Sequence, residues 1–429
     1  MDPSSLFKEH KPPLSTDAAL AEASRCLYCY DAPCTRACPT HIDVPAFIKK
    51  IASDNLRGSA RTIFDANVLG ASCARVCPTE VLCEGACVMN DHHARPIEIG
   101  RLQRYSTDWA AEHGVLPFKR AAVMKAGLGS VGIIGAGPAG LACAAELLRL
   151  GVEPTIYEAS SEAGGLNATG VADYKMTRRT ALVELGELQK AGIRVTTGVR
   201  IGRDLSVAEL EKRHAAIFLG VGLGKVGRLG LPGDELPGVV DAIDYIEELK
   251  VDRKAAAAKT HNRRIAVIGG GNTSIDVVTQ AIRLGAHEVW LLYRRGEAEM
   301  PAYAHEVALA RADGCRFFFA TQAKSITKSG DALAVALASA DALVPQELEV
   351  DVVVLATGQK PHTTFFDEID GLHVERNCVT VDRTTMRSTN PRYWAGGDCV
   401  SGGKEVVNAV AEGKLAARSI LMTLEAARG

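Results

Sequence analysis

The most constraining feature of this chain is a glycine-rich turn between a predicted strand and a predicted helix. The stretch SVGIIGAGPAGLACAAELLRLGVEPTIYEAS contains Gly135-x-Gly137-x-x-Gly140, after an apolar strand that ends at Ile134 and before a second strand that ends at Glu158. Glycines allow a tight turn and close approach to a pyrophosphate, the helix N-terminus attracts its charge, and the acid accepts a hydrogen bond from a ribose. The pattern predicts a Rossmann-type dinucleotide-binding unit.

A second unit of the same kind follows in RRIAVIGGGNTSIDVVTQAIRLGAHEVWLLYRR, where the turn reads Gly269-x-Gly271-x-x-Ser274. Two such turns predict two dinucleotides in one chain. The stretches LATGQKP and YWAGGDCV each show an apolar strand that runs into a glycine turn. In the second of these, Asp398 is placed either beside a flavin ribityl chain or in a plain turn, and the residues alone favour neither.

The cysteines are strongly clustered, because eight of the twelve lie between Cys26 and Cys87. The polar start MDPSSLFKEHKPP lacks the apolar stretch of a secretory signal, so we expect a cytoplasmic and reducing environment. Disulfides are disfavoured there, and a local group of thiols favours metal binding.

Cysteine spacing discriminates between metals. The first run is Cys26-x2-Cys29-x4-Cys34-x3-Cys38-Pro, and the second is Cys73-x3-Cys77-Pro-x4-Cys83-x3-Cys87. Structural zinc prefers two C-x2-C pairs separated by a longer loop, whereas four cysteines this close suit a 4Fe–4S cluster. In the bacterial ferredoxin run that ends in Cys-Pro, the fourth cysteine binds the other cluster, which predicts two clusters with interleaved ligands. A zinc-held docking module is the alternative.

The net charge and the hydropathy of the chain limit the classes of partner that we expect. The 49 Lys and Arg residues nearly cancel the 51 Asp and Glu residues, so nothing favours nucleic acid or an anionic membrane surface. No apolar run reaches the roughly 18 residues that a membrane helix needs. We therefore expect no nucleic acid and no membrane, and a small molecule or a protein as the partner.

The order of these patterns predicts an α/β chain with a mainly helical N-terminal iron–sulfur domain, followed by two Rossmann-like nucleotide-binding domains, the second inserted in the first. The predicted boundaries are 1–127 for the helical domain, 128–226 with 359–429 for the FAD domain, and 227–358 for the NAD(P) domain. We expect the tail NAVAEGKLAARSILMTLEAA to form one amphipathic helix. The run AAAAK at 255–259 is expected to mark a loop or helix end.

Taken in order, the motifs CLYCYDAPC, GASCARVCPTEVLCEGAC, PIEIGRLQRYSTDW, GAGPAG, GGGNTSID and AGGD resemble the electron-input half of dihydropyrimidine dehydrogenase, a relative of the glutamate synthase small subunit. The resemblance covers essentially the whole chain, and its specificity lies in the cysteine region. The chain departs from the family pattern beside the flavin. Relatives have the sequence GIPxFRLP there and this chain has GVADYKMTR, so that Lys175 replaces an arginine.

The resemblance implies two ligand sets for the clusters. One cluster would be held by Cys26, Cys29, Cys34 and Cys87. The other would be held by Cys38, Cys77, Cys83 and the amide oxygen of Gln103. Cys73 is then left over, and the rival assignment exchanges Cys73 and Gln103.

The same comparison and the glycine turns give two sets of nucleotide-binding residues. The FAD set consists of Gly135, Ala136, Gly137, Pro138, Ala139, Gly140, Glu158, Gly165, Leu166, Lys175, Gly397, Asp398 and Val407. The NAD(P) set consists of Gly269, Gly271, Asn272, Thr273, Ser274, Arg294, Arg295, Ala356, Thr357 and Gly358. The arginine pair stands where an NAD site would place an acid, which favours NADPH over NADH.

The resemblance implies an oxidoreductase in which NAD(P)H reduces FAD, and single electrons then pass through two 4Fe–4S clusters to a partner. No general acid, general base or nucleophile is expected. The implied partner is an FMN-containing, PreA-like catalytic subunit that reduces uracil or thymine, in a heterotetramer, because no barrel for pyrimidine reduction is expected in these 429 residues. The alternatives are a glutamate synthase small subunit-like NADPH oxidoreductase and the zinc-based docking protein.

Overall fold

The computed structural model describes residues 7 and 9–428, and these residues form two compact units. The inserted unit comprises 224–360, the short segment 169–178 and the described residues 7 and 9. The main unit comprises 10–168, 179–223 and 361–428. Each unit is described below by itself.

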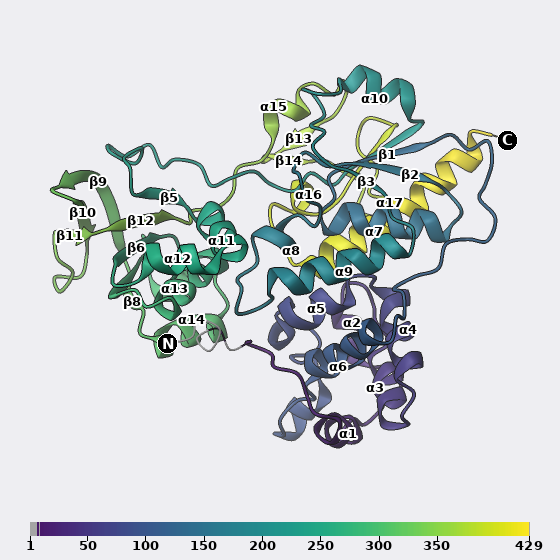
Figure 1. Ribbon diagram of the computed structural model, residues 1–429, viewed down its shortest axis with the longest axis horizontal. Coiled ribbons are helices and arrows are strands. Elements are labelled where there is room, and N and C mark those ends of the chain that lie inside the picture. The colour runs from purple at the N-terminus through teal and green to yellow at the C-terminus, as the bar shows by residue number, and fades with distance from the viewer. Residues whose placement is uncertain (1–6, 8, 429) are drawn as a thin grey trace. The chain divides into compact units, whose positions relative to one another are not determined.

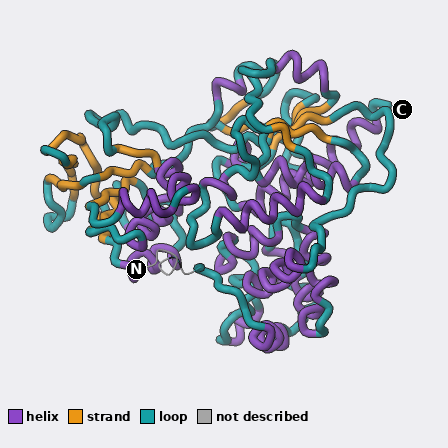
Figure 2. Tube along the Cα trace, viewed as in Figure 1, coloured by secondary structure: helices purple, strands orange, loops and turns teal. Residues whose placement is uncertain are grey.

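The N-terminal part of the main unit is built from helices and loops, as Figure 2 shows in purple and teal. Its helices are α1 Thr16–Ser24, α2 Pro33–Ala37, α3 Val44–Ala52, α4 Leu56–Ala66, α5 Gly70–Val76 and α6 Ile99–Glu112, with the 3-10 turns η2 Thr79–Val81 and η3 Val88–His92. Asp43 caps α3 by accepting from Ala46 N at 3.0 Å, and Asn55 caps α4 by accepting from Gly58 N at 2.9 Å. Phe47, Ile48 and Leu102 pack into one core that also contains buried cysteines.

A parallel sheet follows in the main unit. Its strands are β1 Val131–Ile134, β2 Pro154–Tyr157, β3 Val195–Thr196, β4 Ala216–Leu219 and β15 Tyr393–Ala395, in the order β15-β4-β1-β2-β3. The remaining elements of this part are α7 Pro138–Arg149, α8 Leu166–Thr169, α9 Arg178–Lys190, α10 Val207–Arg213, α15 Thr363–Phe366, β13 Val374–Glu375, β14 Cys378–Val379, α16 Asp398–Ser401 and α17 Val406–Ala426. All four residues of β1 are buried, as expected for a central parallel strand.

Two helices of this part approach each other closely. Figure 1 shows α17 in yellow beside α7, and a Cβ atom added at Gly413 of α17 would lie 2.3 Å from the Ala139 backbone oxygen of α7. Only glycine therefore fits at this crossing.

The inserted unit has a second five-stranded parallel sheet with the order β5-β12-β6-β7-β8. Its strands are β5 Val239–Asp241, β6 Arg264–Ile268, β7 Glu288–Leu292, β8 Arg316–Phe318 and β12 Val352–Leu355. Its helices are α11 Ala242–Val251, α12 Arg253–Thr260, α13 Asn272–Arg283, the 3-10 turn η4 Glu297–Glu299 and α14 Ala304–Asp313. An antiparallel sheet of β9 Thr321–Ser329, β10 Ala332–Ser339 and β11 Glu347–Val350 was not expected from the sequence.

The predicted fold class is confirmed, because a helical N-terminal part precedes two parallel sheets and β15 returns to pair with β4 after the whole inserted unit. The expected C-terminal helix is also found. Of the two alternatives expected for 255–259, the loop is wrong, because this run forms the C-terminal part of α12, which ends at Thr260. Alanine has the highest helix propensity, and Asp252 caps the helix by accepting from Ala255 N at 2.9 Å.

Candidate functional site

Four cysteines from both sequence runs converge on one small hollow in the main unit. Cys26 and Cys29 follow α1, Cys34 lies in α2, and Cys87 directly precedes η3. The rest of the hollow is lined almost entirely by apolar side chains, among them Val44, Pro45, Ile48, Val88, Met89, Ile97 and Ile99. The structure thus brings together the four residues predicted as ligands of one cluster, although 53 positions separate Cys34 from Cys87.

The surroundings of these thiols disfavour their charged form. Burial raises the pKa of Cys26, and neighbouring Cys29 and Cys87 add to this rise. Burial likewise raises the pKa of Cys34 to about 11. A metal cation supplies the positive charge that thiolates need in such a place, and soft sulfur donors converging in an apolar hollow suit an iron–sulfur cluster.

A second group of cysteines gathers around the end of α5. Cys38 ends α2, Cys77 ends α5, and Cys83 follows η2. The pKa of Cys77 lies well above its usual value, first because of a hydrogen bond with Cys73 and then because of burial. Burial raises the pKa of Cys83 well above its usual value, and nearby Cys77 and Cys38 add to the rise. These electrostatic interactions show that Cys38, Cys77 and Cys83 lie close together, and the hydrogen bond shows that Cys73 lies beside Cys77.

Gln103 lies on α6 and is buried. Its amide nitrogen donates to the Gly70 backbone oxygen at 2.8 Å, at the start of α5, so the amide oxygen is the atom left for a ligand role. Gln103 and Cys73 therefore both lie at α5, and the two rival assignments of the fourth ligand stay predictions.

The start of α5 is held by Glu184, a residue that was not predicted as part of the site. Its carboxylate accepts from Ala71 N at 2.9 Å and Ser72 N at 3.1 Å, and also from the Ser72 hydroxyl. Glu184 lies on α9, so this contact joins the cysteine-bearing helix to the nucleotide-binding part of the same unit. An acid at a helix N-terminus is favourable, but no local sequence signal links position 184 to position 71.

The first glycine turn has the geometry of a dinucleotide-binding turn. Gly135 has φ +97°, and a Cβ atom there would lie 2.4 Å from the Gly220 oxygen. A Cβ atom at Gly140 would lie 2.0 Å from the Gly135 oxygen, so the helix can pack closely against the strand only with glycine. Gly137 is the N-cap of α7, and its cap carries no side-chain hydrogen bond within the described residues. The predicted residues Ala136, Pro138 and Ala139 lie on this same turn and first helical turn.

Two neighbouring segments complete the surroundings of this turn. Glu158 follows β2, and its carboxylate accepts from Ala136 N and from Ser160 N, both at 2.8 Å. Gly165 has φ +54° and packs against Gly137, with Leu166 opening α8. Within the described residues, the buried Asn167 Oδ1 has no hydrogen-bond partner. An acceptor of this kind beside the turn fits a ligand with N–H groups, as FAD has.

The segment from β15 to α17 places the predicted residues Gly397, Asp398 and Val407. Gly397 has φ +77° and donates its N–H to Glu412 Oε2 at 2.7 Å. Asp398 accepts from Lys404 N at 3.1 Å, and burial raises its pKa. Val407 is buried in the same core as Cys38, Cys73 and Cys77, so the start of α17 packs against the cysteine region.

Lys175 does not belong to the unit that contains the first glycine turn. It lies in the segment 169–178 of the inserted unit, where its Nζ is 2.9 Å from Asp276 Oδ1 and 2.7 Å from Glu306 Oε1. Its predicted place beside the flavin stays a prediction.

The second glycine turn lies between β6 and α13. Gly271 is the N-cap of α13, and a Cβ atom there would meet nothing within 4 Å, which leaves room for a phosphate at the helix N-terminus. Asn272 Oδ1 accepts from Tyr303 N at 3.0 Å, and Ser274 Oγ donates to the Gly271 oxygen at 2.6 Å. Thr273 lies between them on the first helical turn.

The other predicted nucleotide residues of the inserted unit follow neighbouring strands. Ala356, Thr357 and Gly358 follow β12, and a Cβ atom at Gly269 would lie 2.2 Å from the Ala356 oxygen. Arg294 and Arg295 shortly follow the end of β7 and are exposed. Parallel strands end at one edge of a sheet, so the structure gathers these residues at the edge where dinucleotides bind in such folds.

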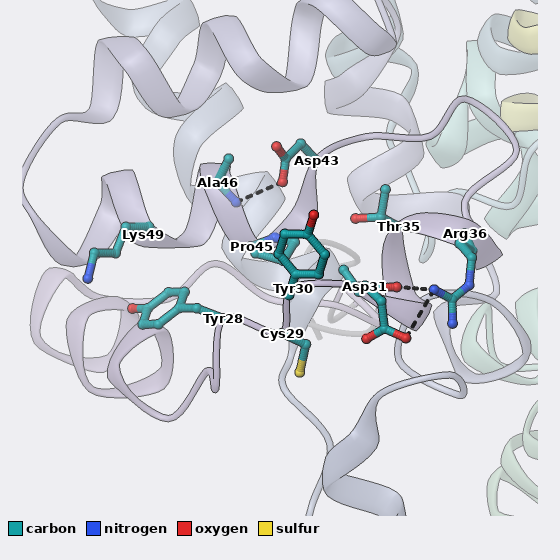
Figure 3. Close-up of a pocket in the computed structure, with 11 residues that line it drawn as sticks. Tyr28, Cys29, Tyr30, Asp31, Thr35, Arg36, Asp43, Pro45, Ala46 and Lys49 are labelled. Carbon is teal, nitrogen blue, oxygen red and sulfur yellow. Dashed lines mark hydrogen bonds and ion pairs between the residues drawn. The ribbon is translucent and has the colours of Figure 1, made fainter.

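A larger hollow of about 610 Å³ in the main unit is lined by Cys29, one residue of the first cysteine set. Figure 3 shows Cys29 and Tyr30 between Tyr28 on the left and Asp31 on the right, where Arg36 is bonded to Asp31. Tyr30 is fully exposed, and Leu27 is 57% exposed. Two large apolar side chains thus lie in solvent directly beside Cys29.

Comparison with protein families gives two matches. Residues 4–115 match the family described as dihydropyrimidine dehydrogenase domain II, 4Fe-4S cluster. Residues 129–413 match the pyridine nucleotide-disulphide oxidoreductase family. The first match covers the eight clustered cysteines and Gln103, and the second covers both glycine turns.

Three relatives are similar over nearly the whole chain. The putative oxidoreductase AegA of Escherichia coli (strain K12) is 35% identical over 97% of this chain and 67% of its own length. The glutamate synthase [NADPH] small chain of Halomonas elongata is 34% identical over 98% of this chain and 93% of its own. The NAD-dependent dihydropyrimidine dehydrogenase subunit PreT of Escherichia coli (strain K12) is 34% identical over 98% of this chain and 97% of its own.

Solved structures show likeness of fold alone. Thioredoxin reductase from T. acidophilum aligns with a TM-score of 0.56 at 20% identity, over 70% of this chain and 99% of that one. FprA from Mycobacterium tuberculosis in complex with NADPH aligns with a TM-score of 0.56 at 18% identity, over 70% of this chain and 85% of that one. In the described part of the chain, the helices are too short or too polar to cross a membrane.

Proposed function

This chain belongs to the pyridine nucleotide-disulphide oxidoreductase family, with the 4Fe-4S domain II of dihydropyrimidine dehydrogenase in front, and from this premise we propose that it is the electron-input subunit of an NAD(P)H-dependent dihydropyrimidine dehydrogenase. The observation that carries the proposal is the hollow lined by Cys26, Cys29, Cys34 and Cys87 in the same unit as the first glycine turn. The domain boundaries predicted from the sequence are part of the proposal.

The chain's own residues would bind and position the cofactors. When bound, FAD and two 4Fe–4S clusters would supply hydride acceptance from NAD(P)H and one-electron transfer. The first glycine turn would seat the FAD pyrophosphate, and the second would seat that of NAD(P)H. Cys26, Cys29, Cys34 and Cys87 would hold one cluster. The other would be held by Cys38, Cys77, Cys83 and Gln103.

The proposed partner is an FMN-containing catalytic subunit that reduces uracil or thymine to the 5,6-dihydropyrimidine, in a heterotetramer. The naming of PreT as a dehydrogenase subunit and of the glutamate synthase relative as a small chain supports a partner chain. We place the docking surface at Leu27 and Tyr30, because exposed aromatic and apolar groups are typical of interface centres and these two lie next to Cys29. The neighbouring charges of Asp31, Arg36 and Lys49 would form a polar rim.

The docking surface is tested with Tyr30→Ser and Leu27→Ser. We expect each variant to keep its iron and its dye reduction with NAD(P)H, and to need at least about tenfold more partner for half-maximal uracil reduction, as expected for the loss of an interface anchor of ~1.4 kcal/mol. Val251→Ser, at an equally exposed apolar residue of α11, is the control. An unchanged partner requirement in both test variants would place the docking surface elsewhere.

The function is tested by mixing the purified chain with an FMN-containing pyrimidine-reducing subunit. The chain alone should reduce artificial dyes with NAD(P)H and leave uracil and thymine unchanged, while the mixture should form 5,6-dihydropyrimidine. Uracil reduction by the isolated 429-residue chain would contradict the proposal, because it would place the pyrimidine site in this chain.

A glutamate synthase small chain is the second candidate, because the Halomonas elongata relative is as similar to this chain as PreT is. The same preparation distinguishes the two. Glutamate formation from glutamine and 2-oxoglutarate with a glutamate synthase large chain, without uracil reduction in the other mixture, would favour this candidate.

A further inference from the structure

Lys11 is a buried cation at the second group of cysteines. Its side chain is 10% exposed, and its Nζ donates to the Cys77 backbone oxygen at 2.6 Å and to Thr79 Oγ1 at 2.7 Å. Its own backbone oxygen accepts from Arg104 Nη1 of α6 at 2.5 Å. Two hydrogen bonds therefore fix the ammonium group beside Cys77, and a third holds the Lys11 backbone.

The carboxylate partner of this ammonium group is distant and partly in solvent. Glu80 Oε2 lies 3.8 Å from Lys11 Nζ, and its side chain is 37% exposed. A buried ammonium group is costly unless a negative charge compensates it. The Lys11 charge works to lower the pKa of both the Cys77 and the Cys83 thiols. The Glu405 charge works to raise the pKa of Cys77, and the Glu84 charge works to raise that of Cys83. The Lys11 charge also opposes the rise in the pKa of the half-buried Glu84. Negative charge at Glu84 and at these two cysteines would therefore compensate the buried ammonium group.

We propose that Lys11 is a positioning residue whose fixed positive charge raises the reduction potential of the cluster bound by Cys38, Cys77 and Cys83. This inference rests on the proposed function, since it takes the second group of cysteines as cluster ligands. Each electron that enters a cluster adds one negative charge, and a buried cation a few ångströms away stabilises the reduced form more than the oxidised form. Within the described residues, Lys11 neither lines the hollow of the first group of cysteines nor is among the charges that shift the pKa of Cys26 and Cys34, so we expect the larger effect at the second cluster.

A higher reduction potential at one cluster affects the direction of electron transfer between the two clusters. Raising the potential of one cluster above that of the other makes a one-electron step toward it downhill. Lys11 would therefore favour electron occupancy of the cluster at α5, the helix that Glu184 joins to the nucleotide-binding part.

The test uses the isolated full-length chain with its cofactors, in an anaerobic redox titration followed by electron paramagnetic resonance. Lys11→Met should lower the reduction equilibrium constant of one cluster about tenfold, which is ~59 mV for a one-electron couple, and leave the other unchanged. Lys11→Gln keeps a donor for the Cys77 oxygen and removes the charge, so it should show the same shift. Lys11→Arg should restore most of the potential. Lys190→Met, at a side chain that is 68% exposed, is the control.

Unchanged potentials in Lys11→Met and Lys11→Gln, with full iron content, would overturn the inference. Loss of iron from both variants would also overturn it, because Lys11 would then act in holding the fold of the cysteine region. The measurement needs no partner chain and no pyrimidine. A failure of pyrimidine reduction with the partner would therefore count against the proposed function and leave the result on Lys11 readable.

Discussion

Cys73 and Gln103 are the rival predictions for the fourth ligand of the second cluster. Cys73 is hydrogen-bonded to Cys77, and Gln103 is bonded through its amide nitrogen to the start of the same helix. The resemblance to dihydropyrimidine dehydrogenase favours Gln103. Spacing alone favours neither, because Cys73 lies within α5 whereas Gln103 reaches the start of α5 from α6 only in the folded chain.

We expect about eight iron atoms per chain, as two 4Fe–4S clusters require. Cys73→Ser should leave this number nearly unchanged, whereas Cys38→Ser should lose most of one cluster. Iron and acid-labile sulfide measured on the anaerobically purified variants provide the test. If Cys73→Ser halves the iron and Gln103→Ala does not lower it, the assignment of Gln103 is wrong.

The choice between NADPH and NADH rests on Arg294 and Arg295, which are exposed beyond the end of β7. Changing both to alanine should lower kcat/KM for NADPH about 10- to 100-fold, because each lost charge-assisted phosphate bond is worth about 1.5–3 kcal/mol, and should affect NADH far less. The relatives are divided, since PreT is named NAD-dependent and the glutamate synthase small chain is named for NADPH. A wild-type kcat/KM that is higher with NADH than with NADPH would contradict the prediction.

Among the elements, the segment 169–178 is held in the inserted unit by polar contacts that could not be predicted from the sequence of the segment. Lys250 of α11 donates from its Nζ to the Met176 oxygen at 2.6 Å, and Tyr174 donates from its hydroxyl to Asp276 of α13 at 2.8 Å. The sequence of this segment predicts a loop, and its partners on α11 and α13 determine where the loop packs.

These contacts predict a pH effect. Burial lowers the pKa of Lys250 to about 8, whereas an unfolded lysine has a pKa near 10.4. Between these values the unfolded chain binds more protons, so this group makes the free energy of unfolding rise with pH, by up to about 3 kcal/mol in total. Denaturant unfolding at pH 7 and pH 10 should show this rise in the wild-type inserted unit and a smaller rise in Lys250→Met. Equal rises in both chains would refute the effect.

At the scale of the whole molecule, electrons are expected to leave by way of the cysteine region. Cys26→Ser and Cys77→Ser should each abolish partner-dependent pyrimidine reduction, while dye reduction directly from the flavin largely survives. The two activities are measured side by side on one preparation, with Cys378→Ser as the control at a cysteine outside the cluster region. Equal loss of both activities would indicate that the substitutions damage the FAD part and not the cluster relay.

Much of the architecture could be predicted because it depends on local patterns. The turns at Gly135 and Gly269, the buried strands before them and the long C-terminal helix each follow from residues within one or two elements. The antiparallel sheet of β9 to β11 escaped prediction, although β9 and β10 form a hairpin around Asp331. Its alternating strands carry no chemistry-bearing motif, and a short, half-buried alternation is a weaker signal than a glycine turn.

The number and spacing of the cysteines, together with the two glycine turns, establish which chemistry is available to this chain. Which of these groups meet depends on packing in the folded chain: Cys34 meets Cys87 in one hollow, Glu184 lies at the start of α5, and Lys11 lies beside Cys77. The physical reason is the separation along the chain over which each effect acts. Turn and helix preferences act between neighbours in the chain, whereas burial of an ammonium group or a carboxylate is stabilised only by partners that packing brings from distant segments.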